Sequence, residues 1–359
     1  MRPHTIRRLV ILTEGQFGVH HAKTAIGVIR YGRDDVVAIL DSTIAGRNVG
    51  EWLGPSHDVP VVATLEEAIA RGADALLIGI APTGGKLPDE WRAVVLSALE
   101  ARLDVLSGLH TFLGDDPEFA SAAAMGGAEI VDYRRVPDRH QTAVGRPHRP
   151  GAKVILTVGS DCAIGKMTVA LELERAAREA GLAGVFVPTG QTGMMIAGWG
   201  VSVDREIADF LAGTCEWLVE QAEEMGDWIF VEGQGSIDHP AYSPVTLGLI
   251  HGTAPHAMVL VHKVGLVEHD WDHAPGVSCP IKPLPELITL HETIAGMVAP
   301  SRVVAIALNT AGVPDDDDAR RIIRETAAET GLPTDDPVRF GPGVLFGAVR
   351  AALESEVVA

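Results

Sequence analysis

Short apolar runs alternate along the whole chain with segments whose apolar residues recur at helical spacing. In the first part, the strand-length runs lie at 9–13, 36–41, 61–63, 75–80 and 103–107. In the second part, they lie at 154–158, 184–187, 228–232, 257–262 and 303–309. Strands with little internal polarity between amphipathic helices are typical of parallel sheets covered on both faces. The pattern predicts an α/β protein with two parallel sheets.

A segment without hydrophobic period separates the two regions. Its sequence, RVPDRHQTAVGRPHRPGAK (135–153), is rich in Pro, Arg, His and Gly, as linkers often are. We therefore predict a Rossmann-like N-terminal domain at 1–135, a linker at 136–153 and a second α/β domain at 154–359.

Composition narrows the class of protein. A chain of 359 residues, 47% of them hydrophobic, is long enough to bury two cores. Its formal net charge of −19 argues against a nucleic-acid partner, because binding a phosphate backbone requires a basic surface. No segment approaches the ~20 apolar residues that span a bilayer, so we expect no membrane partner.

The three cysteines, Cys162, Cys215 and Cys279, show neither disulfide-framework nor metal-knuckle spacing. This favours a reducing compartment, and we expect a cytoplasmic enzyme. Acidic two-domain enzymes are often oligomeric, so we also expect a homo-oligomer.

The most informative segment is VILTVGSDCAIGKMTVAL (154–171). A β-branched run ends in Gly159 and a helical pattern begins near Met167, so a glycine-rich turn joins a strand to a helix. Such a turn directs backbone N–H groups into one concavity, and Lys166 adds a mobile positive charge. Compared with the usual G-x-x-x-x-G-K-[ST] pattern, Gly159 lies one residue too early, and Met167 replaces the metal-binding hydroxyl, with Thr168 beside it. The segment predicts a phosphate site.

The second domain is therefore expected to be P-loop NTPase-like. The residues expected to bind the phosphate-containing cofactor are Gly159, Ser160, Asp161, Cys162, Ala163, Ile164, Gly165, Lys166, Met167 and Thr168. At the end of the strand VVAIALNT, the carboxamide of Asn309 offers a donor and an acceptor for a base edge. A turn-forming Asn is an equally good interpretation.

An acidic residue stands near this loop in the predicted sheet. Glu232 ends a buried strand, and a carboxylate one strand away from a phosphate loop commonly faces a bound magnesium ion. If the ligand is ATP with magnesium, the expected metal ligands are Thr168 and Glu232; the alternative is a strand-end carboxylate that caps a helix. Glu232 and the nearby His239 are also candidates for catalytic acid or base.

Polar loops follow two neighbouring strands of the first domain, and His110 in SGLHTFLGDD is a third catalytic candidate because such loops face one crevice. The turn LTEGQFGVHHAKTA lacks the G-x-G-x-x-G fingerprint, which disfavours a conventional NAD site. The candidate substrate-binding residues of the chain are Lys23, Gly84, Gly85, Lys86, Gln191, Thr192 and Gln234.

A metal interpretation of the segment 262–273 is disfavoured. HDWDH (269–273) places acids and histidines close together, but it lies in a predicted loop and matches no helix-based ligand spacing.

Two resemblances to known protein families extend these predictions. GSDCAIGKMT with VEGQG resembles the dethiobiotin-synthetase-like branch of P-loop proteins, which has the same longer glycine spacing. A wider resemblance, to the DgcN-like family named for D-glutamate N-acetyltransferase, rests on HAKTA (21–25), VVAILDST, IGIAPTGGKLPDEW, SGLHTFL, GSDCAIGKMT, GQTGMMIAGWG, VEGQGS, TLGLIHG, and ALNT with DPVRFG. The departures from that family's pattern are His20-His21 and the loop HKVGLVEHDWDH.

The wider resemblance implies transfer of an acetyl group from acetyl-CoA to the amine of a small amino-acid substrate, D-glutamate. It implies that the loop holds the diphosphate of CoA, that Glu232 or His239 accepts a proton, and that Lys23, Lys86 or an arginine binds the substrate carboxylates. Two alternatives stay open: an ATP- and magnesium-dependent ligase or kinase-type enzyme, and a nucleotide-sensing regulatory protein.

Overall fold

The computed structural model describes residues 6–18, 22–82, 84–269 and 278–355. His20, His21 and the residues 270–273 of HDWDH lie outside the described part. The chain divides into two compact units. The first holds Met1–Pro137 with Gln191–Arg205, and the second holds Asp138–Gly190 with Glu206–Ala359.

The first unit is built on a parallel sheet of six strands in the order β3-β2-β1-β4-β5-β6. Its strands are β1 (Arg8–Leu12), β2 (Asp35–Leu40), β3 (Val61–Val62), β4 (Ala75–Ile78), β5 (Asp104–Ser107) and β6 (Ile130–Asp132). This order is that of the Rossmann fold, so the predicted Rossmann-like sheet is confirmed.

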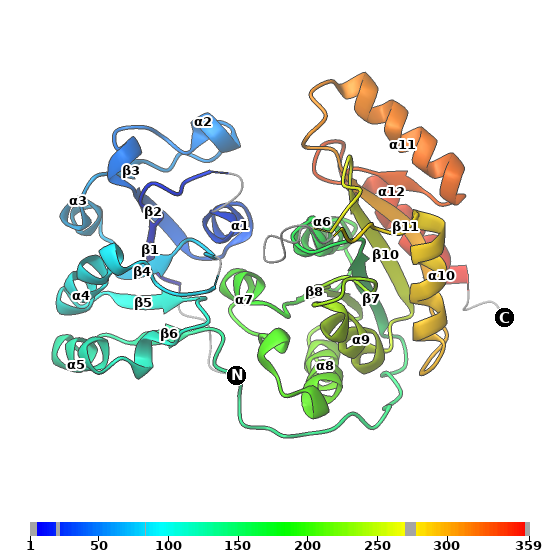
Figure 1. Ribbon diagram of the computed structural model, residues 1–359, viewed down its shortest axis with the longest axis horizontal. Coiled ribbons are helices and arrows are strands. Elements are labelled where there is room, and N and C mark those ends of the chain that lie inside the picture. The colour runs from blue at the N-terminus through cyan, green and yellow to red at the C-terminus, as the bar shows by residue number, and fades with distance from the viewer. Residues whose placement is uncertain (1–5, 19–21, 83, 270–277, 356–359) are drawn as a thin grey trace. The chain divides into compact units, whose positions relative to one another are not determined.

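Helices cover both faces of this sheet. They are α1 (Lys23–Tyr31), α2 (Gly50–Leu53), α3 (Leu65–Ala70), α4 (Arg92–Glu100), α5 (Pro117–Gly126) and, from later in the chain, α7 (Gln191–Ala197). Figure 1 shows α3, α4 and α5 on one face and α1 and α7 on the other. Short 3-10 turns lie at Ser42–Ile44, Asp89–Trp91, Leu113–Asp115 and Val203–Arg205.

The second unit is built on another parallel sheet, in the order β12-β11-β10-β7-β9-β8. Its strands are β7 (Lys153–Gly159), β8 (Gly184–Val187), β9 (Trp228–Val231), β10 (Ala257–Lys263), β11 (Arg302–Asn309) and β12 (Thr334–Asp335). Its helices are α6 (Lys166–Glu179), α8 (Ala208–Glu223), α9 (Ser243–Thr253), α10 (Leu284–Ala295), α11 (Asp316–Thr330) and α12 (Gly343–Ser355). The predicted α/β class with two parallel sheets is confirmed.

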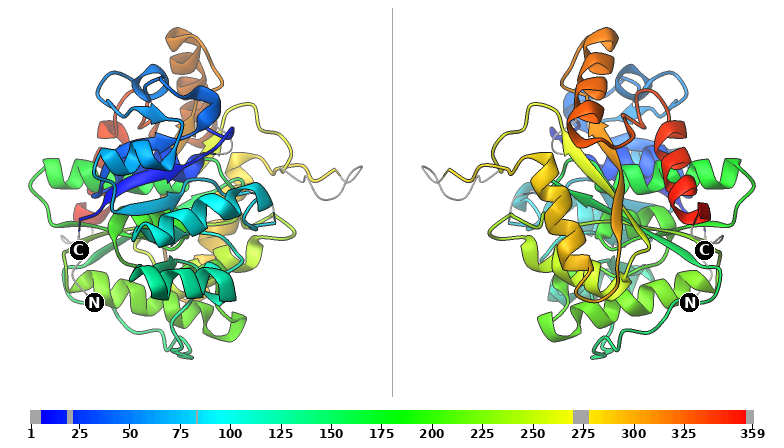
Figure 2. Two further views of the ribbon diagram at one scale, coloured as in Figure 1. Left: turned by 90° about the vertical axis from the view of Figure 1, so that its left-hand side faces the viewer. Right: turned by 90° about the vertical axis from the view of Figure 1, so that its right-hand side faces the viewer.

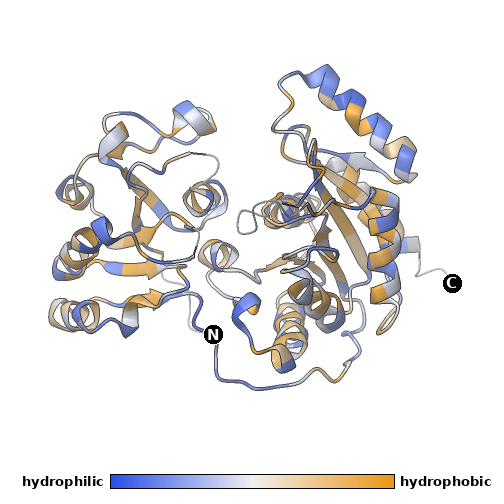
Figure 3. Cartoon of the chain, in the orientation of Figure 1, coloured by the Kyte–Doolittle hydropathy of each residue, from blue (hydrophilic) through white to orange (hydrophobic). Residues whose placement is uncertain are grey.

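The helices of the second unit form two layers. One layer, α6 and α12, contacts the sheet through β7, β8, β9, β10 and β11; the other consists of α8, α9 and α10. Figure 2 shows these helices from two sides, and Figure 3 shows hydrophobic strands between them and a largely hydrophilic α11. β9 is buried throughout and β10 is buried except at its last two residues, as expected for a parallel sheet covered on both faces. Among the described residues, no helix combines the length and apolarity needed to cross a bilayer.

The segment predicted as a linker packs against the second unit. The N–H groups of Val144 and Arg146 donate to the Glu216 carboxylate on α8. Arg149 pairs with Asp227 at 2.6 Å, so basic residues of the segment meet acidic residues at the end of α8 and just beyond it. Residues 138–152 therefore belong to the second unit, although they form neither helix nor strand.

Candidate functional site

The predicted phosphate loop leaves the carboxyl end of β7, the strand between β10 and β9. Ala163 and Gly165 have left-handed φ angles of 54° and 118°, and α6 begins at the next residue, Lys166. A φ of 118° is one that side-chain-bearing residues rarely adopt, which explains the glycine before the lysine. The loop thus ends on the open N–H groups of a 14-residue helix.

Lys166 is drawn into this loop. Its side chain is only 5% exposed, and its Nζ donates a 2.5 Å hydrogen bond to the backbone carbonyl of Asp161. Burial lowers the pKa of Lys166 to about 8, against the opposing effect of the nearby Cys162, Asp161 and Glu232. The ammonium of Lys166 therefore loses its charge at a pH only slightly above neutral.

Two neighbouring strands hold the loop in place. The Nδ2 of Asn309, the last residue of β11, donates to the carbonyl of Ile164 at 3.0 Å. Ser160 hydrogen-bonds through its Oγ to Nδ1 of His262 on β10 at 2.8 Å. Asn309 thus contacts the loop backbone, and its predicted contact with a base edge stays a prediction.

Glu232 lies directly after β9, beside the loop. Its Oε2 accepts hydrogen bonds from the backbone N–H groups of Thr189 and Gly190, at 2.9 and 3.2 Å. Hydrogen bonds of this kind favour the ionised carboxylate. Gln234 donates from Nε2 to the Thr189 carbonyl at 2.6 Å, so the ends of β8 and β9 are joined through both side chains.

The close approach of these strands depends on one glycine. The N–H of Gly233 donates to Thr157 Oγ1 on β7 at 2.9 Å. A Cβ at position 233 would lie 1.6 Å from the Thr157 carbonyl oxygen, so no side chain fits there. This contact brings Glu232 next to the loop.

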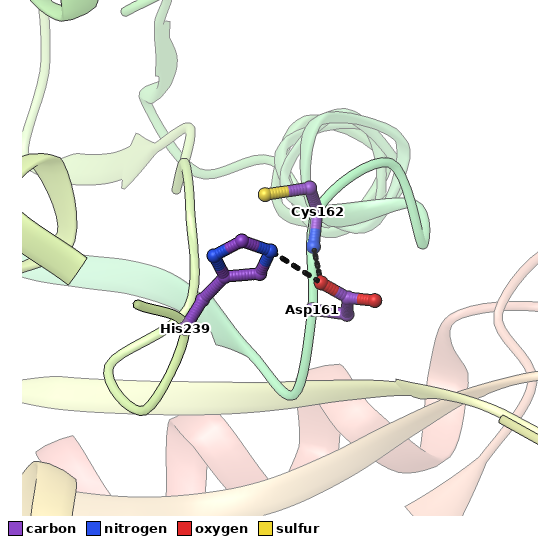
Figure 4. A group of neighbouring side chains, drawn as sticks. All are labelled: Asp161, Cys162 and His239. Atoms are coloured by element: carbon purple, nitrogen blue, oxygen red, sulfur yellow. Dashed lines mark hydrogen bonds and ion pairs between the residues drawn. The ribbon is translucent and has the colours of Figure 1, made fainter. Parts of the chain in front are cut away.

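A buried network of acidic residues and histidines contacts the loop at Asp161. Asp161 Oδ1 accepts from the N–H of Cys162 at 2.7 Å and lies 3.1 Å from His269 Nδ1. His269 Nε2 lies 3.4 Å from Asp238 Oδ2, so this imidazole sits between two carboxylates. His239 Nε2 lies 4.0 Å from Asp161 Oδ1 (Figure 4). The sequence drew attention to the His-rich segment that contains His269, but only the fold shows its contact with the loop.

Asp161, Cys162 and His239 place one carboxylate oxygen, the sulfur and one imidazole nitrogen within 4.8 Å of one another. Zinc uses such donors in proteins. Asp161 Oδ1, however, already accepts the Cys162 N–H, and His239 Nδ1 accepts the N–H of Ala241 at 3.1 Å. A neutral ring that accepts at Nδ1 carries its proton at Nε2, the nitrogen that faces Asp161. Because these atoms already take part in hydrogen bonds, the cluster is better suited to place hydrogen-bonding groups around the Cys162 thiol than to bind a metal ion through all three residues.

The remaining loop residues take different environments. Met167 and Thr168 are half-buried in the first turn of α6, and Ala163 is exposed. A magnesium role for Thr168 and Glu232 stays a prediction.

Other predicted residues belong to the first unit. His110 donates its backbone N–H to the Gly85 carbonyl at 2.9 Å, and a Cβ on Gly85 would lie 2.3 Å from His110 Cδ2. Partial burial lowers the pKa of His110, and the nearby Arg134 lowers it further. Lys23, Gly84 and Lys86 are exposed, and Lys23 is the first residue of α1.

The predicted pair Gln191 and Thr192 also contacts the first unit. Thr192 Oγ1 lies 3.1 Å from Thr24 Oγ1 on α1, and Gln191 Oε1 accepts from Arg134 Nη2 at 2.8 Å. Arg134 is 7% exposed, donates to the Gly108 carbonyl at 2.9 Å and pairs with Asp204. The sequence does not single out this arginine, because a single Arg after a short strand carries no motif.

The predicted candidates therefore fall into two groups. The second unit brings together the loop, Glu232, Gln234, His239 and Asn309. The first unit holds Lys23, Gly84, Gly85, Lys86, His110, Gln191 and Thr192.

Comparison with known proteins places this geometry in a family. Residues 141–346 match a domain of unknown function described as the DUF1611 C-terminal P-loop domain, and residues 42–136 match the DUF1611 N-terminal Rossmann-like domain. A crystal structure of a DUF1611 family protein from Anabaena variabilis has a TM-score of 0.89 and 40% sequence identity, covering 96% of this chain and 99% of that one.

Two relatives carry a name that describes an activity. A protein named D-glutamate N-acetyltransferase from Tritonibacter scottomollicae is 36% identical over 92% of this chain and 94% of its own. A protein of the same name from a Pseudoalteromonas species is 35% identical over 77% of this chain and 81% of its own. The resemblance drawn from the sequence motifs is thereby confirmed.

Proposed function

The chain belongs to the DUF1611 family, and from this premise we propose that it is an N-acetyltransferase that moves an acetyl group from acetyl-CoA to the amine of D-glutamate. The observation that supports the proposal most is the 36% identity to a D-glutamate N-acetyltransferase along 92% of the chain. Similarity of this extent includes both units rather than the P-loop alone.

The loop has anion-binding groups of the kind that an acetyl-CoA donor requires. Acetyl-CoA has two parts on which an anion-binding loop can act: the diphosphate, and the oxyanion that develops on the thioester carbonyl during transfer. The sequence-based prediction is the diphosphate. Lys166 and the N–H groups at the start of α6 are suited to either part.

Glu232 is the better candidate for the base that deprotonates the substrate ammonium. Its carboxylate is held by two backbone N–H groups, whereas His239 uses Nδ1 as an acceptor and so presents a proton at Nε2. We assign proton acceptance to Glu232 and a hydrogen-bond-donor role to His239. The exposed Lys23 and Lys86, predicted for the substrate carboxylates, stay candidates for that role.

The proposal is tested by incubating the purified chain with acetyl-CoA and D-glutamate and following both free CoA thiol and N-acetylglutamate by mass spectrometry. We expect equal amounts of both products, with L-glutamate and D-aspartate as specificity controls. Consumption of ATP with magnesium and an amino acid, without any acetylated product, would instead establish a ligase. Thermal stabilisation by a nucleotide without turnover of any pair of substrates would establish a sensor.

A further inference from the structure

One thiol of the chain sits inside the candidate site. Cys162 is the fourth residue of the loop that begins at Gly159, and it is half-exposed, whereas Asp161 and His239 beside it are fully buried. Its sulfur lies within 4.8 Å of both a carboxylate oxygen of Asp161 and a nitrogen of His239. Figure 4 shows the thiol on the side of the His239 ring. The sulfur is therefore the member of this cluster that a ligand can approach.

The surroundings favour a reactive thiolate. A thiolate in the loop that leads into α6 is met by the positive end of the helix dipole and by the ammonium of Lys166, and both stabilise a negative charge. Lys166 Nζ donates to the carbonyl of Asp161, the residue before Cys162, so the ammonium lies beside this part of the loop. His239 adds a proton donor at Nε2, since its Nδ1 is occupied as an acceptor by the Ala241 N–H.

The other two cysteines differ in these respects. Cys215 lies within α8, is fully buried, and burial raises the pKa of its thiol. Cys279 is partly exposed, lies in the segment before α10, and belongs to no cluster of three His, Cys, Asp or Glu among the described residues. Among the described residues, Cys162 is the cysteine that shares a cluster with a carboxylate and a histidine.

We propose that Cys162 is a catalytic nucleophile, which takes the acetyl group from the thioester of acetyl-CoA and passes it to the amine of the acceptor. This inference rests on the proposed N-acetyltransferase function and specifies its route. It also specifies which part of the donor enters the loop. The pantetheine arm separates the thioester from the diphosphate by many bonds, so one CoA cannot place both at Cys162. The thioester end enters, and the diphosphate binds elsewhere.

The first step exchanges one thioester for another. The Cys162 thiolate attacks the acetyl carbonyl, a new carbon–sulfur bond forms, and the bond to the CoA sulfur breaks with its electron pair. The leaving CoA thiolate takes a proton and departs as CoA thiol. During attack, the carbonyl oxygen gains negative charge that Lys166 and the N–H groups of the first turn of α6 can stabilise.

The second step forms the amide. The acceptor ammonium loses one proton to Glu232, its nitrogen attacks the acetyl-cysteine carbonyl, and the carbon–sulfur bond breaks to return the Cys162 thiolate. The nitrogen loses a second proton as the amide forms. The sum of both steps converts acetyl-CoA and an ammonium into an N-acetyl product, CoA thiol and one released proton.

The direct test omits the acceptor. The full-length protein is mixed with acetyl-CoA alone, quenched in acid and measured by intact mass, followed by peptide mapping. We expect a mass increase of one acetyl group on wild type, located on the peptide that contains Cys162, removed by hydroxylamine and lost when D-glutamate is added. We expect the same label on Cys279→Ser and none on Cys162→Ala.

Kinetic measurements complete the test. Wild type is expected to exchange labelled CoA into acetyl-CoA in the absence of acceptor, as a two-step transfer requires. Cys162→Ala is expected to lose on the order of 10³-fold or more in kcat, and Cys162→Ser serves as a second variant that keeps nearly the same volume. Circular dichroism melts show whether each variant is folded.

The outcomes are separable. N-acetyl product formed by folded Cys162→Ala or Cys162→Ser at the wild-type rate, or wild type that forms product but never carries the label, would overturn the acetyl-cysteine route and leave the proposed function standing. Absence of any N-acetyl product from wild type would overturn the proposed function itself.

Discussion

The dipeptide Gly-Lys follows a parallel strand in each unit, at Gly85-Lys86 after β4 and at Gly165-Lys166 after β7. Both glycines adopt left-handed φ angles, 63° and 118°. The lysines differ. Lys166 opens a 14-residue helix and is buried, whereas Lys86 is exposed and precedes a proline-containing turn.

This difference shows what an anion-binding loop requires beyond its dipeptide. At Lys166, the helix begins at the lysine itself, so the N–H groups of its first turn and the ammonium act at one place. At Lys86, a 3-10 turn begins only at Asp89, and an exposed ammonium is screened by water. The arrangement at Lys166 is therefore better suited to an anion than that at Lys86.

The largest effect is expected when each lysine loses its charge. Lys166→Met should lower kcat/KM of acetyl transfer by about 10³-fold, because the buried donor proposed for the developing oxyanion is lost. Lys86→Met should change it by less than about tenfold, since an exposed cation that pairs with a carboxylate contributes little. Steady-state kinetics of both variants measure the contrast, and equal losses would contradict it.

The next effect concerns the close strand contact that holds Glu232. Gly233→Ala should destabilise the protein by about 3 kcal/mol, because the added Cβ would overlap the Thr157 carbonyl. Gly84→Ala has open space around its Cβ but a φ of 81°, so only a smaller backbone cost, about 1 kcal/mol, is expected there. Urea denaturation of both variants gives the two free energies of unfolding.

A further test concerns the first unit, where Arg134 joins α7 to the loop after β5. Arg134→Ala should cost about 2 kcal/mol of stability, because it removes hydrogen bonds to Gln191 and Gly108 and an ion pair with Asp204. Arg135→Ala is the control: the Arg135 side chain is exposed where it pairs with Asp115 at 2.6 Å and Asp132 at 3.8 Å, so a change below about 1 kcal/mol is expected. Similar melting curves for the two variants would argue against an anchoring role of Arg134.

The smallest effect is one of pH. Burial lowers the pKa of Lys166 to about 8, so its ammonium is present below that pH and is lost above it. The contribution of Lys166 to kcat of acetyl transfer should fall by up to about tenfold per pH unit as the pH rises above 8, because the ammonium proposed to stabilise the oxyanion loses its proton. Steady-state kinetics between pH 7 and pH 9.5 measure this slope. Lys166→Arg should remove it, and Lys86→Arg should leave it in place.

The sequence alone was sufficient for the class of fold and for the loop. Apolar runs of strand length between amphipathic segments indicated two parallel sheets, and both sheets are present. The glycine and lysine of the loop were recognisable because a strand-to-helix turn needs a left-handed residue at one fixed position. Both features are local, so short stretches of the sequence are enough to predict them.

Tertiary structure decided which side chains meet. His269 follows Asp161 by 108 residues and contacts it, and Gly233 fits against Thr157 across two strands. Similarly, Gln191 and Thr192 directly follow a turn of the second unit but pack with the first. The hydrophobic periodicity of the sequence does not predict such pairs, because contacts between distant segments depend on the order of the strands in the sheet and on how the side chains pack. The surroundings of Cys162 belong to this second category: the sequence places the thiol in the loop, and the fold supplies its histidine.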